Sequence, residues 1–183
     1  MNVHSITDVR RKVLPLLFTT LLCACSPSGL SPNDLAKLAE GLPVKPHTPD
    51  ETVQLGMGFA PAPARAGETV TLLVKIQIAP AWHIYSTNQI AGPYTPTTLK
   101  LALPNGISAV GDWIVPTPKK DPKHSLLIYE GTVVFGRRLR IAPGAAGALK
   151  VSCDFGYQTC DAQTCLRPTT AKLEATVEVA AAK

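Results

Sequence analysis

The sequence lacks several features that often reveal a function. Its longest apolar run, Val13–Ala24, is about a dozen residues long, too short to span about 30 Å of hydrocarbon as a helix. Only two methionines are present, which argues against a methionine-rich copper carrier. After residue 24 the basic residues are scattered, with 119–120 and 137–138 as the only adjacent pairs, so the sequence has no nucleic-acid-binding footprint.

The first part of the chain, residues 1–24, has the pattern of a signal peptide that is removed on export. Basic residues at 10–12 precede the apolar run, which ends in Leu22–Cys25 (LCAC). This ending resembles the lipobox of bacterial lipoprotein precursors, which implies that Cys25 carries the lipid and begins the mature chain. Cys23 fits less well because a leucine precedes it. The alternatives are an ordinary secretory signal with incidental cysteines, or a single transmembrane anchor.

Two or three acyl chains hold a protein on a bilayer essentially permanently. Ser26 follows the lipidated cysteine, and by resemblance to enterobacterial sorting this favours the outer membrane over the inner. We expect the proline-rich segment 25–50 to be an extended, poorly packed tether. One short helix is expected within it, because Ser31 suits the N-cap, Pro32 the first helical position and Gly41 the stop.

Residues 51–183 are predicted to form one all-β domain. In Lys172–Val179 apolar and polar residues alternate with a period of two, typical of a strand with one face in water. The expected strands are Thr52–Ala60, Thr69–Ile78, His83–Thr87, Thr97–Leu103, Ile107–Ile114, Leu126–Leu139, Leu149–Gln158 and Lys172–Val179. About seven to nine short strands at this spacing favour an antiparallel β-sandwich.

With Cys23 removed and Cys25 lipidated, three cysteines remain, and an exported compartment permits disulfides. Because three is an odd number, one thiol is left over or pairs between molecules. Cys153 lies in an expected strand, on the same face as Val151, Phe155 and Tyr157. It is therefore interpreted as a small buried hydrophobic residue.

Cys160 and Cys165 flank a four-residue connection of hairpin length, which can bring their Cα atoms to the ~5.5 Å that a disulfide requires. So small a loop removes little entropy from the unfolded chain. From composition alone, a redox-active pair and a structural disulfide are equally supported. A metal site, in which Cys153 and either His83 or His124 complete the ligands, is a weaker third alternative. The second cysteine pair that zinc sites usually show is missing, so we expect no metal.

Four segments together resemble one family. Tyr157–Pro168 (YQTCDAQTCLRP) resembles the cysteine signature of the N-terminal periplasmic domain of DsbD-type thiol–disulfide interchange proteins. Upstream, in the same order, Ala81–Tyr85 (AWHIY), Pro96–Gly106 and Ile128–Gly131 (IYEG) resemble three further family segments. The resemblance covers roughly residues 52–180. It implies an immunoglobulin-like β-sandwich whose cysteine pair alternates between dithiol and disulfide, here as a stand-alone lipoprotein.

The resemblance also implies roles for individual residues. Cys165 is expected to form the mixed disulfide with a partner, and Cys160 to resolve it, as in a cofactor-free protein-disulfide reductase. The residues expected to line the binding pocket are His83, Tyr85, Tyr157 and His124, although for His83 and Tyr85 simple packing is an equal alternative. The chain ends at Lys183 without the membrane part or thioredoxin-like domain of full-length members. A thioredoxin-like or membrane thiol reductase is therefore expected as a separate electron donor, and exported disulfide-containing proteins as acceptors.

The sequence departs from the family at one point. Members often cap the cysteine pair with an aromatic residue, but the matching loop Pro116–Ser125 (PTPKKDPKHS) has none, and His124 is the nearest substitute. The sequence therefore does not predict shielding of the pair by such a cap. The rival hypothesis is a non-catalytic immunoglobulin-like binding or assembly lipoprotein, in which the Cys160–Cys165 bridge is structural.

Overall fold

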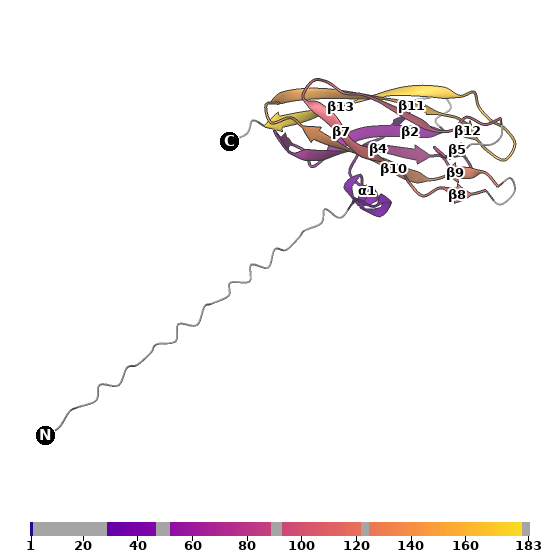
Figure 1. The fold of residues 1–183 in the computed structure, drawn as a ribbon. Helices are drawn as coiled ribbons and strands as arrows, with labels where there is room; N and C mark the ends of the chain where they lie inside the picture. The colour runs from indigo at the N-terminus through magenta and orange to yellow at the C-terminus, as the bar shows by residue number, and fades with distance from the viewer. Residues whose placement is uncertain (2–28, 47–51, 89–92, 122–124, 181–183) are drawn as a thin grey trace.

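The computed structural model describes residue 1 and residues 29–46, 52–88, 93–121 and 125–180 (Figure 1). The predicted signal peptide, Cys25 and His124 lie outside the described residues. Within the described ranges, no helix has the length and apolar character needed to cross a membrane.

These residues form one helix, α1 (Pro32–Leu38), and thirteen strands in three sheets. The five-stranded sheet has the order β1 (Lys45–Pro46), β2 (Val53–Ala60), β4 (Thr69–Ile78), β10 (Thr132–Ile141), β7 (Ile107–Ile114). The first four-stranded sheet has the order β3 (Ala64–Arg65), β13 (Thr169–Ala180), β11 (Gly147–Tyr157), β6 (Thr98–Ala102). The second four-stranded sheet has the order β12 (Thr159–Cys160), β5 (His83–Tyr85), β9 (Leu127–Tyr129), β8 (Lys119–Lys120). All neighbours pair antiparallel except β13 and β3.

The core lies between the five-stranded sheet and the β11–β13 sheet (Figure 1). Val74 and Phe135 from the first sheet and Phe155 and Leu173 from the second belong to one buried cluster. Each fully buried side chain of this size stabilises the fold by about 1.5–3 kcal/mol. The predicted immunoglobulin-like β-sandwich is confirmed.

Seven of the eight predicted strands are confirmed in place, and Thr69–Ile78 and Ile107–Ile114 keep their predicted bounds. The prediction of one strand over Leu126–Leu139 is wrong, because the chain there forms β9 and β10 with a break between them. Gly131 lies in that break with φ of 65°, a backbone conformation that glycine tolerates and a strand does not use. The break lets β9 join the β5 sheet while β10 joins β4.

The predicted short helix is confirmed. Ser31 is its N-cap, and the Ser31 and Asp34 side chains each accept a hydrogen bond from the other residue's backbone N–H, which completes a capping box. The prediction of a poorly packed tether, however, is wrong for residues 30–46. Leu35 and Ala39 are fully buried against the outer face of the five-stranded sheet, and Lys45–Pro46 pair with β2.

Two features of the sheet hold α1 in place. Gly136 leaves room for Leu35, since a Cβ at position 136 would lie 2.6 Å from the Leu35 Cδ2 atom. The Lys75 Nζ atom donates hydrogen bonds to three carbonyl oxygens at the end of the helix, those of Ala39, Glu40 and Leu42, at 3.0, 3.2 and 3.2 Å. Helix carbonyls that lack intrahelical partners, and the negative end of the helix dipole, favour a cation there.

The docking of α1 depends on Leu35. We expect Leu35→Ala to weaken this docking by about 2–5 kcal/mol, because it leaves a cavity over Gly136. Leu38→Ala is the matched control, since Leu38 lies on the same helix but is 45% exposed. Hydrogen exchange of the amides of residues 31–46 measures the effect. Equal exchange rates in the two variants would show that Leu35 does not hold the helix.

Cys153 is a buried free thiol on the core face of β11, between Leu101 on β6 and Leu173 on β13. Burial, followed by the charge of Asp154, raises the pKa of this thiol from 9.0 to about 12.

We expect no alkylation of Cys153 by iodoacetamide at pH 8 in the native protein and rapid alkylation in urea. The free energy of unfolding should fall as the pH rises above 9.0, where only the unfolded thiol ionises. Rapid labelling of the native protein would contradict the buried position.

Candidate functional site

Cys160 lies in the β12–β5–β9–β8 sheet, at one end of the sandwich (Figure 1), and Cys165 faces it in an isolated antiparallel bridge. Thr159 and Cys160 form the two-residue strand β12, which pairs with Ile84 and His83 of β5. This strand directly follows β11, whose alternation places Phe155 and Tyr157 in the core. The position of Cys160 is therefore set by a strand that is anchored in the core.

Cys160 and Cys165 form a disulfide with an S–S distance of 2.01 Å and a Cα–Cα distance of 4.1 Å. The predicted tight connection is confirmed: the Asp161 N–H donates to the Thr164 carbonyl, and the Leu166 N–H donates to the Thr159 carbonyl, both at 2.9 Å. The Asp161 carboxylate accepts the N–H groups of Gln163 and Thr164 at 2.8 and 2.6 Å. These backbone hydrogen bonds, with a smaller contribution from the charge of His83, lower the pKa of Asp161.

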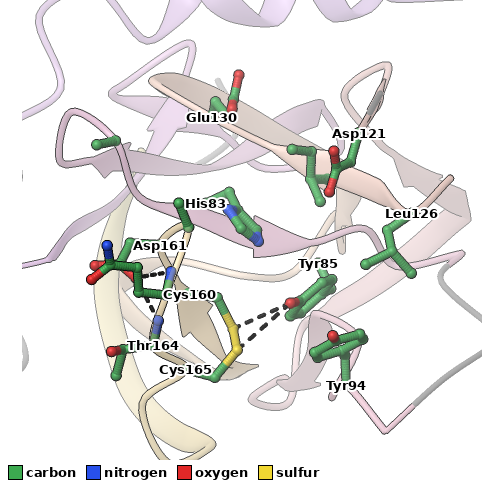
Figure 2. A pocket seen from close by; sticks show the side chains of 14 residues that line it. His83, Tyr85, Tyr94, Asp121, Leu126, Glu130, Cys160, Asp161, Thr164 and Cys165 are labelled. Atoms are coloured by element: carbon green, nitrogen blue, oxygen red, sulfur yellow. Dashed lines mark hydrogen bonds between the residues drawn. A yellow bond between two sulfur atoms is a disulfide. The ribbon is translucent and has the colours of Figure 1, made fainter. Parts of the chain in front are cut away.

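The two bonded sulfurs lie in different surroundings. Cys160 is 1% exposed, whereas Cys165 is exposed to solvent. The Tyr85 hydroxyl donates a hydrogen bond to the Cys160 Sγ atom at 3.2 Å and lies 3.8 Å from the Cys165 Sγ atom (Figure 2). Burial, with smaller effects of Tyr94 and Asp121, raises the pKa of Tyr85 to about 12. Its hydroxyl therefore remains a proton donor throughout the physiological pH range.

A cleft of about 370 Å³ opens over the disulfide (Figure 2). Tyr94 stacks on Tyr85 with ring centroids 4.7 Å apart, and the His83 ring meets Tyr85 edge-on at 5.4 Å. Carboxylates line the cleft as well, those of Asp121, Glu130 and Asp161. The exposed residue Cys165 thus lines an open cleft with an aromatic wall.

Gln158 ties the loop that carries Tyr94 to the cysteine segment. Its Oε1 atom accepts the Thr95 N–H at 2.9 Å, and its Nε2 atom donates to the Leu166 carbonyl at 3.1 Å. Two residues further along the same loop, the Thr97 N–H donates to the Tyr85 carbonyl at 3.1 Å. These contacts hold the Tyr94 ring over Tyr85.

The structure brings four of the sequence-predicted residues together, since His83, Tyr85, Cys160 and Cys165 all line the cleft. The prediction for Tyr157 is wrong: its side chain is fully buried in the core, 5.4 Å from the Phe155 ring between centroids. The physical reason is the strand alternation, which gives Tyr157 the same inward direction as Cys153 and Phe155.

Sequence reasoning missed Tyr94, Asp121 and Glu130. Asp121 lies in the loop Pro116–Ser125 and Glu130 in the Ile128–Gly131 segment. Both residues belong to segments named above, but no sequence spacing linked either carboxylate to the cysteines. The aromatic ring stacked beside the pair comes from Tyr94, on a different loop from the one expected to supply a cap. Within the described part of the chain, no three His, Cys, Asp or Glu side chains gather as metal ligands do.

Several solved structures are similar to this chain. The N-terminal periplasmic domain of ScsB from Proteus mirabilis has a TM-score of 0.50 and 16% identity, over 75% of this chain and 50% of that one. The reduced DsbD N-terminal domain of Neisseria meningitidis has a TM-score of 0.41 and 14% identity, over 72% and 90% of the two chains. This chain thus spans about half the length of the ScsB structure, and identities this low concern the fold alone. A search of curated proteins found no match.

The sequence also matches the family described as "Thiol:disulfide interchange protein DsbD, N-terminal" over residues 51–177. The match covers more than half of the chain and includes the whole cleft and both bonded cysteines. The chain therefore belongs to the family of DsbD N-terminal domains.

Proposed function

We propose that this protein is a thiol–disulfide carrier of the bacterial cell envelope, which passes reducing equivalents through Cys160 and Cys165 to exported proteins. The observation that supports this most strongly is the asymmetry of the disulfide, with one cysteine exposed in a cleft and the other buried beneath a hydroxyl donor. Thiol–disulfide exchange requires an accessible sulfur for attack and a stabilised leaving sulfur.

In the reducing step, a thiolate of the donor attacks the Cys165 Sγ atom. A new S–S bond forms between donor and Cys165, the Cys160–Cys165 bond breaks, and its electron pair goes to the Cys160 Sγ atom. The Tyr85 hydroxyl already donates to this sulfur and stabilises the resulting thiolate. The donor's second thiolate then releases Cys165, so the donor dithiol becomes a disulfide and the cysteine pair gains two electrons and two protons.

Delivery to an acceptor follows the same path in reverse. The Cys165 thiolate attacks the acceptor's disulfide and forms a mixed disulfide. Cys160 then attacks the Cys165 Sγ atom, restores the internal bond and frees the reduced acceptor. All electrons stay on sulfur, so the exchange needs no cofactor. We infer a thioredoxin-like or membrane thiol reductase as donor and exported disulfide-containing proteins as acceptors, in agreement with the family.

A purely structural bridge is the alternative, and it gains little from this position. Closing so short a loop stabilises the fold by only about 2 kcal/mol in the chain-entropy account. The hydrogen bonds of Asp161 and Leu166 already hold the same turn without the disulfide. An exposed cysteine in an open cleft adds a site of attack that a structural bridge does not need.

We further propose that residues 1–24 are removed and that Cys25 carries a lipid, which places the protein on the periplasmic side of the envelope, with the outer membrane favoured. Because α1 packs on the sheet, the tether is shorter than the predicted segment 25–50. The five residue steps from Cys25 to Leu30 reach at most about 18 Å, and Leu30 already packs against the α1 cluster. The anchor therefore keeps the domain close to the bilayer.

Cys160→Ser is expected to trap mixed disulfides, because Cys165 can still attack a partner but nothing inside the protein resolves the bond. The trapped species should appear on non-reducing gels of cell envelopes and disappear with dithiothreitol. Cys153→Ser is the matched control and should trap nothing, since Cys153 is buried in the core. If Cys160→Ser traps no partner through Cys165, the assigned roles of the two cysteines are wrong.

Cys25→Ser is expected to prevent lipidation and move the protein from the membrane fraction to the soluble fraction of the envelope. Cys23→Ser should leave the protein on the membrane, because Cys23 belongs to the removed segment. Membrane retention of Cys25→Ser, measured by fractionation and by mass spectrometry of the mature N-terminus, would contradict the proposed anchor.

A further inference from the structure

His83 is the cross-strand partner of the buried cysteine. In the β5–β12 ladder it stands opposite Cys160, and both residues line the same cleft. Directly opposed residues of an antiparallel pair have Cβ atoms about 4.5–5.5 Å apart on the same face. Figure 2 shows the His83 ring in this cleft with the disulfide and Tyr85. The ladder therefore fixes an imidazole next to the sulfur that leaves when the disulfide is attacked.

The charged groups around this sulfur are mostly negative. Asp121 and Glu130 line the cleft near the β8 and β9 strands, and Asp161 follows Cys160 directly. The phenols of Tyr85 and Tyr94 are the other titratable groups there apart from the cysteines. Among the described residues that line the cleft, His83 alone can carry a positive charge.

The leaving sulfur needs such a charge. Cys160 is almost fully buried, and an ionised group without a compensating partner is costly in that position. The hydroxyl of Tyr85 supplies a hydrogen bond but no net charge. Asp121 and Asp161 oppose a thiolate, since like charges disfavour the ionised form. The Glu130 carboxylate opposes it less, because the Lys119 Nζ atom pairs with it at 3.1 Å.

We propose that the His83 imidazolium stabilises the Cys160 thiolate and thereby sets the pH dependence of disulfide exchange at this site. This inference rests on the proposed carrier function. The donor sulfur bonds to Cys165, the electron pair of the broken S–S bond goes to Cys160, and the new negative charge lies beside the imidazolium. The thiolate later takes its proton from water, so His83 acts through its charge and is a positioning residue.

The expected direction follows from the loss of that charge. An imidazole loses its proton between about pH 5 and pH 8, so the rate of reduction per donor thiolate should fall as the pH rises through that range. Each unit by which the pKa of the leaving thiol rises slows exchange by about threefold, for a Brønsted coefficient of ~0.4–0.5. We expect an overall fall of about three- to tenfold in the native protein.

The test is the reduction of the oxidised protein by dithiothreitol between pH 5 and pH 9, with each rate constant divided by the thiolate concentration of the reagent. The native protein should show the fall. His83→Gln should be slow and independent of pH, whereas His83→Lys, which keeps a charge, should be fast and independent of pH. Protection of Cys153 from alkylation reports that the core is intact in each variant.

If His83→Gln keeps the slope of the native protein, the inference is overturned, because a carboxylate such as Asp121 then sets the pH dependence. The inference is also overturned if the reduction rate of His83→Lys depends on pH as steeply as that of the native protein. His83→Lys decides the question if His83→Gln does not fold. Failure of the carrier function looks different: dithiothreitol then leaves the disulfide intact in the native protein at every pH.

Discussion

The pairing of β12 with β5 is the constraint on which the site depends. Two residues, Thr159 and Cys160, pair with Ile84 and His83 and bring the cysteine beneath the Tyr85 hydroxyl. Cys160 is held in this ladder and is buried, whereas Cys165, which faces it in an isolated bridge after the turn, is an exposed residue. In the proposed exchange, this arrangement directs thiolate attack to Cys165 and the leaving charge to Cys160, whose sulfur has a hydrogen-bond donor.

The sandwich supplies the rigidity that this asymmetry needs. β11 pairs with β13 along its whole length, and its inward residues fill the core up to Tyr157, three residues before Cys160. On the outer face of the other sheet, α1 is anchored by Leu35 and by the Lys75 ammonium. The site and α1 therefore belong to one packed body. The partner that we propose would meet a preformed cleft, which reduces the ordering cost of binding.

Much of this architecture could be predicted from sequence because it depends on local signals. Period-two alternation located the long strands, and the Ser31–Asp34 capping box located α1. The spacing of Cys160 and Cys165 indicated a bridged turn but left its purpose open. Only the resemblance of four ordered segments to a known family favoured redox exchange over a structural bridge.

The remaining features depend on contacts between distant residues. Leu35 reaches the sheet only because position 136, about one hundred residues later, is a glycine, and a seven-residue helix has too few turns to show an apolar face. Tyr94 joins the cleft through the hydrogen bond between Thr95 and Gln158, which no local pattern announces. For Tyr157, in contrast, the local sequence held the right answer. The family motif suggested a position in the pocket, but the strand alternation, which is visible in the sequence, places Tyr157 in the core.

The central claim is that the Cys160–Cys165 bond is made and broken in use, and its reduction potential tests this most directly. The protein is equilibrated with glutathione or dithiothreitol buffers of known reduction potential, then quenched with acid and alkylated. This gives the fraction of the Cys160–Cys165 pair that is oxidised at each buffer potential. The account predicts a value between about −270 and −180 mV, the range of thioredoxins and disulfide isomerases. A value well below about −300 mV would mark a structural bridge and contradict the account.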